Sequence, residues 1–236
     1  IDSTNNWALD RCQIPDCLPA VCVAECQSQG RGRRGRSWMS PYGQNVYLSL
    51  AWLFRIPTDR ISGLGLVIAV VIVRLLKDYG LKGQIKWPNE VLVEGRKIAG
   101  TLIEARIKEA GSACVAIGVG LNFNMQPEAG IEIEQPWTSM MQELADSDVV
   151  DRNDVVGRLI TILVEACEEY EKLGLDAFLP EWRAHDICVG HKVDVLAEDG
   201  CQQGVVQGVN AKGGLIVRQN GVESPIYAGD VSIRVR

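Results

Sequence analysis

Residues Gln27–Trp38 read Gln-Ser-Gln-Gly-Arg-Gly-Arg-Arg-Gly-Arg-Ser-Trp. Four arginines and three glycines occupy positions 30–36 of this stretch, in a chain whose formal net charge is −6. Glycines at this density disfavour helix and strand, because they cost backbone entropy and offer no side chains to pack. Their backbone N–H groups can instead surround an anion while guanidinium groups close over it. The stretch therefore predicts a loop that grips a phosphate or a nucleotide.

Strand-like runs flank this loop, Val21–Cys26 before it and Asn45–Leu53 after it. The glycines at positions 30, 32 and 35 have the G-x-G-x-x-G spacing of dinucleotide-binding folds, but in those folds the motif opens a helix. No helical pattern follows Gly35, and no acidic residue ends the next strand to bind a ribose. A Rossmann site is therefore excluded, and the G-x-x-x-x-G-K-[ST] phosphate loop is absent from the sequence.

The rest of the first 185 residues alternates between helical and strand-like patterns. The predicted helices begin at Asp2–Asn5 and cover Thr58–Tyr79, Pro136–Leu144, Asp154–Leu173 and Ala177–Arg183. The further predicted strands are Gln84–Trp87, Val91–Val93, Lys97–Ile107 and Ala113–Gly118. By pattern alone, Ser3, Thr4 and Asn5 are better explained as helix caps than as ligand contacts.

From Ile187 onward the composition changes to short alternating runs separated by turn residues. These runs are Lys192–Leu196, Gln202–Val209, Gly214–Gln219 and Val231–Val235. About 50 residues with turn signals at this spacing are enough for a small five-stranded barrel of the SH3-like type. We therefore predict two domains, residues 1–185 and residues 186–236.

Charge and composition exclude several classes of protein. An acidic chain lacks the basic footprint of a general nucleic-acid or membrane-surface binder. The longest nearly uninterrupted apolar run, Leu64–Val73, is far shorter than the roughly 20 residues that cross a bilayer. We see no secretory signal and expect a cytoplasmic protein. The chain begins at Ile1 without a methionine, which leaves upstream residues open.

Eight cysteines and two histidines limit the metal and redox chemistry. The first four cysteines, Cys12, Cys17, Cys22 and Cys26, lack the paired C-x2-C spacing of a zinc site. We predict reduced thiols throughout, as is usual in the cytosol. With only His185 and His191, the sequence excludes histidine-based triads and HExxH metal sites.

Two lysine-bearing segments complete the cationic set: Lys86-Trp87-Pro88-Asn89-Glu90 and Arg96-Lys97-Ile98-Ala99-Gly100. Lysines and arginines that converge at strand ends would neutralise a triphosphate and the charge that develops during phosphoryl or nucleotidyl transfer. Asn89 and Glu90 carry the oxygens that could contact a hydrated Mg²⁺. No serine or cysteine nucleophile stands beside a base, so we expect no covalent enzyme intermediate.

Taken in order along the chain, these motifs resemble those of biotin protein ligases, the biotin–[acetyl-CoA carboxylase] ligases. The resemblance rests on Asp2–Asn5, Gln27 with Gly30–Arg36 and Trp38, Lys86–Asn89, Arg96–Gly100, and Gly118-x-Gly120-x-Asn122. It covers the whole chain and implies an α+β fold, a mixed β-sheet with helices packed on it, followed by the SH3-like barrel. It also implies that ATP and biotin give biotinyl-5′-AMP, from which a lysine of the biotin carboxyl carrier protein takes the biotinyl group.

The resemblance assigns roles to residues at matching positions. The implied catalytic residues are Lys97, Arg33, Arg31 and Lys86. The implied biotin-binding residues are Ser3, Thr4, Asn5, Gln27, Arg31, Gly32, Arg33, Trp38, Lys97 and Gly100. The implied nucleotide-binding residues are Arg33, Arg36, Lys86, Asn89 and Asn122, with Glu90 as a weak metal ligand for Mg²⁺. Two positions depart from relatives, since Glu90 stands where Asp is common and His191 where some carry arginine.

The resemblance also sets expectations about partners. We expect the biotin carboxyl carrier protein as acceptor, no membrane, and no DNA binding, because no helix-turn-helix domain precedes the ligase motifs in this sequence. A homodimer is left open. One alternative is a lipoate or octanoate ligase or transferase of the same fold. Another is an RNA-binding module that uses Arg31–Arg36 with Trp38 and Tyr42, which the acidic charge and the lysine motifs disfavour.

Overall fold

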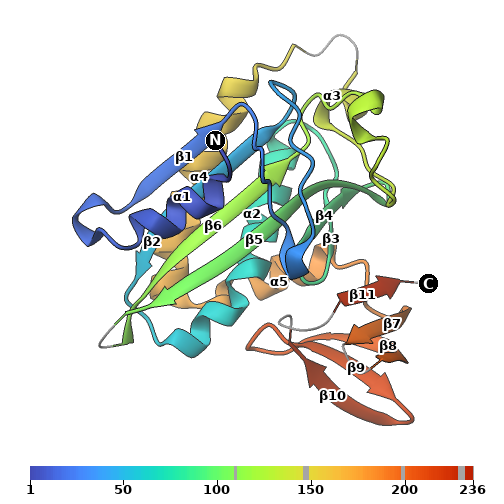
Figure 1. The fold of residues 1–236 in the computed structure, drawn as a ribbon. Coiled ribbons are helices and arrows are strands. Elements are labelled where there is room, and N and C mark those ends of the chain that lie inside the picture. The colour runs from blue at the N-terminus through green and yellow to red at the C-terminus, as the bar shows by residue number, and fades with distance from the viewer. Residues whose placement is uncertain (109–110, 146–148, 198–199, 228–231, 236) are drawn as a thin grey trace.

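A computed structural model describes residues 1–108, 111–145, 149–197, 200–227 and 232–235. Its centre is a six-stranded sheet in the order β1-β2-β6-β5-β4-β3 (Figure 1). The strands are β1 (Ala20–Ala24), β2 (Val46–Phe54), β3 (Gln84–Lys86), β4 (Glu90–Val93), β5 (Arg96–Ile107) and β6 (Ala113–Leu121). All neighbouring strands pair antiparallel. Parallel pairing in the described residues is confined to isolated bridges, Ile85 with Asp186 and Lys97 with Trp137.

Helices cover both faces of this sheet (Figure 1). One face packs against α2 (Leu64–Asp78), α4 (Arg152–Leu173) and α5 (Leu179–His185), and here lies the main apolar core. The opposite face carries α1 (Thr4–Arg11) and the arginine–glycine loop. The second cluster beneath α1 is built from small residues: Ala8, Cys12, Ala51, Cys114 and Ala116. The larger apolar cluster thus lies on the face covered by α2, α4 and α5, and the smaller one lies on the face that carries α1 and the loop.

The C-terminal residues form a separate five-stranded antiparallel sheet in the order β10-β9-β8-β7-β11. Its strands are β7 (Lys192–Ala197), β8 (Gly200–Val209), β9 (Leu215–Gln219), β10 (Val222–Ile226) and β11 (Ser232–Val235). The strand count agrees with the predicted SH3-like unit, although the sequence pattern missed β10. Val231, the first residue of one predicted strand, lies outside the described residues. The boundary between residues 185 and 186 stays a prediction.

The fold class is α+β, as predicted, and the differences concern short elements. The predicted helix Thr58–Tyr79 is a 3₁₀ helix, η3 (Thr58–Gly63), followed by α2. The predicted helix Pro136–Leu144 shrinks to α3 (Met140–Glu143), because residues 136 and 138 bond to the backbone of Lys97 instead. Further 3₁₀ turns are η1 (Pro15–Cys17), η2 (Arg33–Gly35), η5 (Pro127–Gly130) and η6 (Leu175–Ala177). In the residues searched, no helix is both long and apolar enough to cross a membrane.

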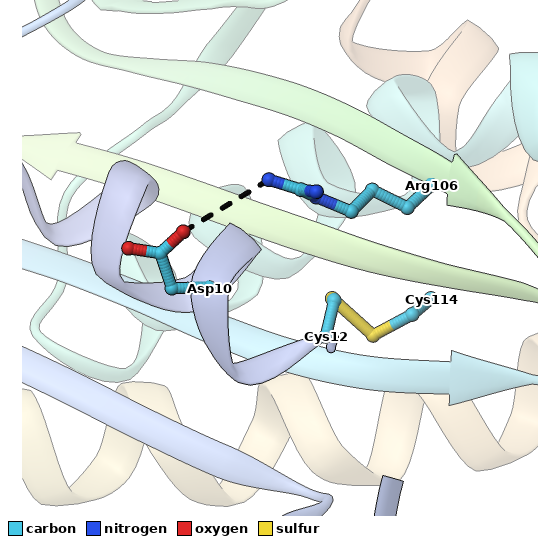
Figure 2. The surroundings of a disulfide bond; sticks show 4 residues. All are labelled: Asp10, Cys12, Arg106 and Cys114. Atoms are coloured by element: carbon cyan, nitrogen blue, oxygen red, sulfur yellow. Dashed lines mark ion pairs between the residues drawn. A yellow bond between two sulfur atoms is a disulfide. The ribbon is translucent and has the colours of Figure 1, made fainter. Parts of the chain in front are cut away.

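The prediction that all cysteines are reduced is wrong for one pair. Cys12, which caps the end of α1, and Cys114 on β6 form a disulfide with a Cα–Cα distance of 5.4 Å (Figure 2). Nearby, Asp10 and Arg106 form an ion pair at 3.9 Å between the same helix and β5. The pairing was invisible to sequence spacing because the two cysteines are 102 residues apart and meet only through the packing of α1 on the sheet.

Candidate active site

Strand register creates a hollow on the α1 face of the sheet. Across β5 and β6, Gly100 lies opposite Gly120 and Leu102 opposite Gly118, while Ser49 of β2 pairs with Gly118 from the other side. Side chains on one face of a strand alternate with those on the other, so the small residues of β6 share the α1 face. Missing side chains at Gly118 and Gly120 leave the space that α1 and the loop then line.

A small polar pocket lies at the start of α1. The Oε1 atom of Gln27 accepts hydrogen bonds from the Thr4 backbone N–H at 2.9 Å and from the Thr4 hydroxyl at 3.1 Å. Ser49 donates to Thr4 Oγ1 at 2.8 Å, and Ser3 is the N-cap whose hydroxyl accepts from the Asn6 N–H. The pocket measures about 30 Å³ and is lined by Ser3, Thr4, Asn5, Gln27, Arg31, Leu48, Ser49, Leu102, Gly118 and Val119. The segment Ser3–Asn5 therefore both caps α1 and lines the pocket, so the two explanations considered for it are compatible.

Trp38 forms an apolar wall beside this pocket. A Cβ at position 120 would lie 2.4 Å from the Trp38 ring, and one at position 100 would lie 3.1 Å from it. Only glycine therefore fits at position 120. The ammonium of Lys97 lies 5.3 Å from the centre of the indole ring, within the range of a cation–π contact. This arrangement puts a fixed cation at the end of an apolar surface.

Glu90 joins the two predicted catalytic lysines. One of its carboxylate oxygens accepts from Lys97 Nζ and the other from Lys86 Nζ, each at 2.8 Å. Burial opposes the charged carboxylate, but the ammonium groups of Lys97 and Lys86 outweigh it and lower the pKa of Glu90 to about 2. The carboxylate therefore stays ionised and holds both lysines in place at neutral pH.

The arginine–glycine loop surrounds a larger cavity of about 400 Å³. The loop closes on itself through a hydrogen bond from the Gly32 N–H to the Arg36 carbonyl at 2.7 Å, and residues Gln29–Ser37 line the cavity together with Leu102 and Glu104. Arg33 donates to Asn89 Oδ1 at 3.4 Å. Burial lowers the pKa of Arg33, the neighbouring Arg36 and Arg34 lower it further, and Glu90 partly opposes them. An anion entering here would relieve that crowding of positive charge.

Arg31 lies where the two cavities meet, since it lines both. Its guanidinium forms an ion pair with Glu104 of β5 and donates to Asn6 of α1. In this arrangement Arg31 closes the small pocket, and its charge is balanced by Glu104.

Comparison with known proteins assigns these features to a family. The family model described as "Biotin/lipoate A/B protein ligase family" matches residues 1–122. The chain is 37% identical over 236 residues to the bifunctional ligase/repressor BirA of Salmonella typhimurium. The aligned region covers 99% of this chain and 72% of BirA. The chain belongs to the biotin/lipoate A/B protein ligase family.

Other members are consistent with this assignment, and the chain is accordingly a ligase. A Mycobacterium tuberculosis protein named biotin--[acetyl-CoA-carboxylase] ligase is 29% identical over 219 residues, covering 89% of this chain and 77% of that protein. The fold matches a biotin protein ligase of Aquifex aeolicus solved with biotin and ATP, with a TM-score of 0.76 and 24% identity. That match covers 100% of this chain and 96% of the Aquifex chain.

In the structure, two residues predicted to bind the nucleotide or a metal, Asn122 and Glu90, contact other groups of the chain. Asn122 is buried, and its amide donates to the Thr138 carbonyl at 2.9 Å, so it braces the segment before α3. Its contact with a nucleotide stays a prediction. The described residues that were searched hold no group of three or more His, Cys, Asp or Glu side chains suited to a metal. Both Glu90 oxygens are already occupied by lysines, so these residues do not fit a protein-held Mg²⁺.

Sequence reasoning missed Ser49 and Glu104 in this biotin/lipoate ligase family member. Ser49 sits within the otherwise mostly apolar β2, and Glu104 follows the apolar pair Leu102–Ile103 of β5. Both lie on the same face as Gly118 and Leu102. The available signal was the alternation itself, because a polar side chain on the same face as buried residues of a strand needs a polar partner. Which partner it faces depends on strand register and on the position of α1.

Proposed function

We propose that this ligase activates biotin with ATP as biotinyl-5′-AMP and transfers the biotinyl group to a lysine of the biotin carboxyl carrier protein. The observation that carries the proposal is a continuous series of neighbours. The Lys97–Glu90–Lys86 cluster lies beside Trp38. The Trp38 ring packs on Gly120, and Gly118, two residues before it in β6, lines the pocket that also holds Thr4 and Gln27. These surfaces are complementary to an acid whose polar head group enters the Thr4–Gln27 pocket, whose apolar chain lies along Trp38, and whose carboxylate meets Lys97. The relatives named above as biotin ligases support the same substrate.

In the first step, a biotin carboxylate oxygen attacks the α-phosphorus of ATP. A new P–O bond forms as the bond to pyrophosphate breaks. Lys97 would hold the carboxylate and the α-phosphate oxygens together and counter the negative charge of the transition state. Lys86, Arg33, Arg36 and Asn89 would face the departing phosphates. Glu90 keeps both lysines oriented without itself touching substrate.

In the second step, the amine of the acceptor lysine attacks the activated carbonyl carbon. A C–N bond forms, the C–O bond to AMP breaks, and the amine loses a proton. The loop around Arg33 would retain the adenylate and exclude water until the acceptor arrives. Any Mg²⁺ would enter with the nucleotide phosphates, where it would neutralise charge, rather than through a site built by this chain.

The test uses the purified chain with ATP, Mg²⁺, biotin and an apo carrier domain, followed by streptavidin blotting. We expect label on the carrier and none when its acceptor lysine is changed to arginine. Parallel reactions replace biotin with lipoate and detect the product by mass spectrometry. Modification by lipoate but not by biotin would reverse the proposed specificity.

A further inference from the structure

Glu104 is a charged residue on β5 that contacts both the loop and α1. In the strand register it lies opposite Ala116, one step beyond the Leu102–Gly118 pair that floors the small pocket. Its side chain is 26% exposed. One carboxylate oxygen accepts from Asn5 and the other from Arg31. One carboxylate therefore contacts both Asn5 of the pocket and Arg31 of the loop.

The contact with Asn5 determines which end of the Asn5 amide faces inward. A carboxylate only accepts hydrogen bonds, so the amide must present Nδ2 to Glu104. The opposite end, Oδ1, then lies 3.2 Å from the Ser49 hydroxyl, whose single proton it shares with Thr4 Oγ1. Oδ1 also sits 2.7 Å from where a Cβ of Gly118 would be, so Asn5 is packed tightly against β6. Asn5 is thereby kept as an acceptor on the pocket side.

The contact with Arg31 closes the same pocket. At about 30 Å³ the pocket has space for little more than water, so entry of a ligand head group requires Arg31 to swing outward. Gly30 and Gly32 flank Arg31 in the chain and carry no side chains to hinder that movement.

We propose that Glu104 is a positioning residue for the head group of the acid substrate, a role that rests on the function proposed above. Its first oxygen orients Asn5 so that Oδ1 accepts from an N–H of a cyclic urea. Its second oxygen holds Arg31 beside the pocket in this arrangement. A head group without N–H donors gains nothing from this arrangement, so Glu104 contributes to the choice of substrate.

Replacing Glu104 with glutamine tests the role, because glutamine keeps the shape but has one acceptor oxygen. The Arg31 cation forms the stronger hydrogen bond and takes that oxygen, which leaves Nε2 facing Asn5 and turns the Asn5 amide around. In biotin-dependent pyrophosphate exchange, we expect Glu104→Gln to raise the KM for biotin about tenfold or more. The kcat and the KM for ATP should stay within about threefold, and the Tm within about 2 °C.

A reciprocal change supplies the rescue. Asn5→Asp alone sets two carboxylates against each other and should also raise the KM for biotin. Combined with Glu104→Gln, the new carboxylate accepts from Gln Nε2 and again presents an oxygen inward. The double variant should therefore return the KM for biotin to within about threefold of wild type. Asp78→Asn, which breaks an ion pair with Arg158 on the other side of the sheet, is the control and should change neither KM.

An unchanged KM for biotin in Glu104→Gln, or a double variant no better than the worse single one, would overturn the proposal. Equal losses for biotin and ATP with a lowered Tm would also overturn it, since they indicate a purely structural role. If the wild-type chain shows no biotin-dependent exchange at all, the proposed function itself fails, and this outcome is distinct from a failure confined to Glu104.

Discussion

Glu90 is the residue through which two predicted catalytic lysines are held. Its carboxyl is almost fully buried, and its only charged hydrogen-bond partners among the described residues are Lys86 and Lys97. Removal of one member of such a buried cluster leaves an uncompensated buried charge, so single substitutions in it strongly destabilise the fold. The cluster therefore couples the stability of this site to its chemistry.

This coupling predicts a pH-dependent stability that Glu90→Gln removes. The folded-state pKa of about 2 lies below the ordinary value of 4.5, so Glu90 stabilises the fold above pH 4.5 and loses this effect as the pH falls towards 2. The shift corresponds to about 3 kcal/mol at neutral pH. Urea unfolding should show wild type more stable than Glu90→Gln at pH 7, with the gap closing towards pH 2. A gap that does not change with pH would contradict this account.

Arg33 is the loop arginine that donates to Asn89, beside the Glu90–lysine cluster. Arg33→Gly should loosen retention of the adenylate, so that free biotinyl-AMP leaks and labels lysines of a bystander protein such as albumin. Arg34→Gly is the matched control, because Arg34 donates to the Leu196 carbonyl instead of Asn89, and glycine readily adopts its φ of 58°. Equal trapping of the adenylate by wild type and Arg33→Gly would count against the loop as a lid.

Helix α1 packs on the sheet through small buried residues. The fully buried ones are alanines and the disulfide pair, and larger side chains such as Trp7 and Leu53 are only partly buried there. Small side chains bring the helix close enough for Thr4 and Asn5 to reach Ser49, but they bury little area. The Cys12–Cys114 bond and the helix caps therefore help to hold the pocket residues in place, together with this packing.

Loss of the disulfide should consequently weaken the fold. A bond between residues 102 apart restricts the unfolded chain strongly, and removal of such bonds typically costs about 2–5 kcal/mol. We expect dithiothreitol to lower the urea midpoint of wild type, and to leave the Cys12→Ala/Cys114→Ala variant unchanged. Cys17→Ser, at an exposed free thiol, should keep the wild-type response to reductant. A midpoint indifferent to reductant in wild type would show that the bond does not stabilise the protein.

The two sheets of the molecule meet next to the lysine motif. The indole N–H of Trp87, a fully buried side chain beside Lys86, donates to the carbonyl of Gly213 at 3.2 Å. Gly213 has a φ of +81°, and a Cβ there would approach Gly63 Cα to 3.1 Å. The C-terminal sheet thus supports the segment that presents Lys86 and Asn89.

A matched pair of glycines tests this contact. Gly213→Ala and Gly221→Ala impose nearly the same backbone strain, at φ of +81° and +82°. Only a Cβ at position 213 would meet the rest of the chain, at Gly63, Leu66 and Leu175, whereas one at position 221 has nothing within 4 Å. Each should cost about 1 kcal/mol from strain, and Gly213→Ala should cost roughly 1 kcal/mol more. Urea midpoints of the two variants provide the comparison. Equal losses would mean that the contact between the sheets contributes nothing measurable.

The sequence by itself determined the order of strands and helices, the loop at Gly30–Arg36, and the motifs that carry the family resemblance. These features are local, because turn residues, glycine density and hydrophobic period act between near neighbours. Only the tertiary structure decided that Glu104 faces Asn5 and Arg31, that Glu90 bridges two lysines, and that Cys12 meets Cys114. Contacts of this kind are set by strand register and by the docking of α1, which join residues far apart in the chain and leave no local pattern to find.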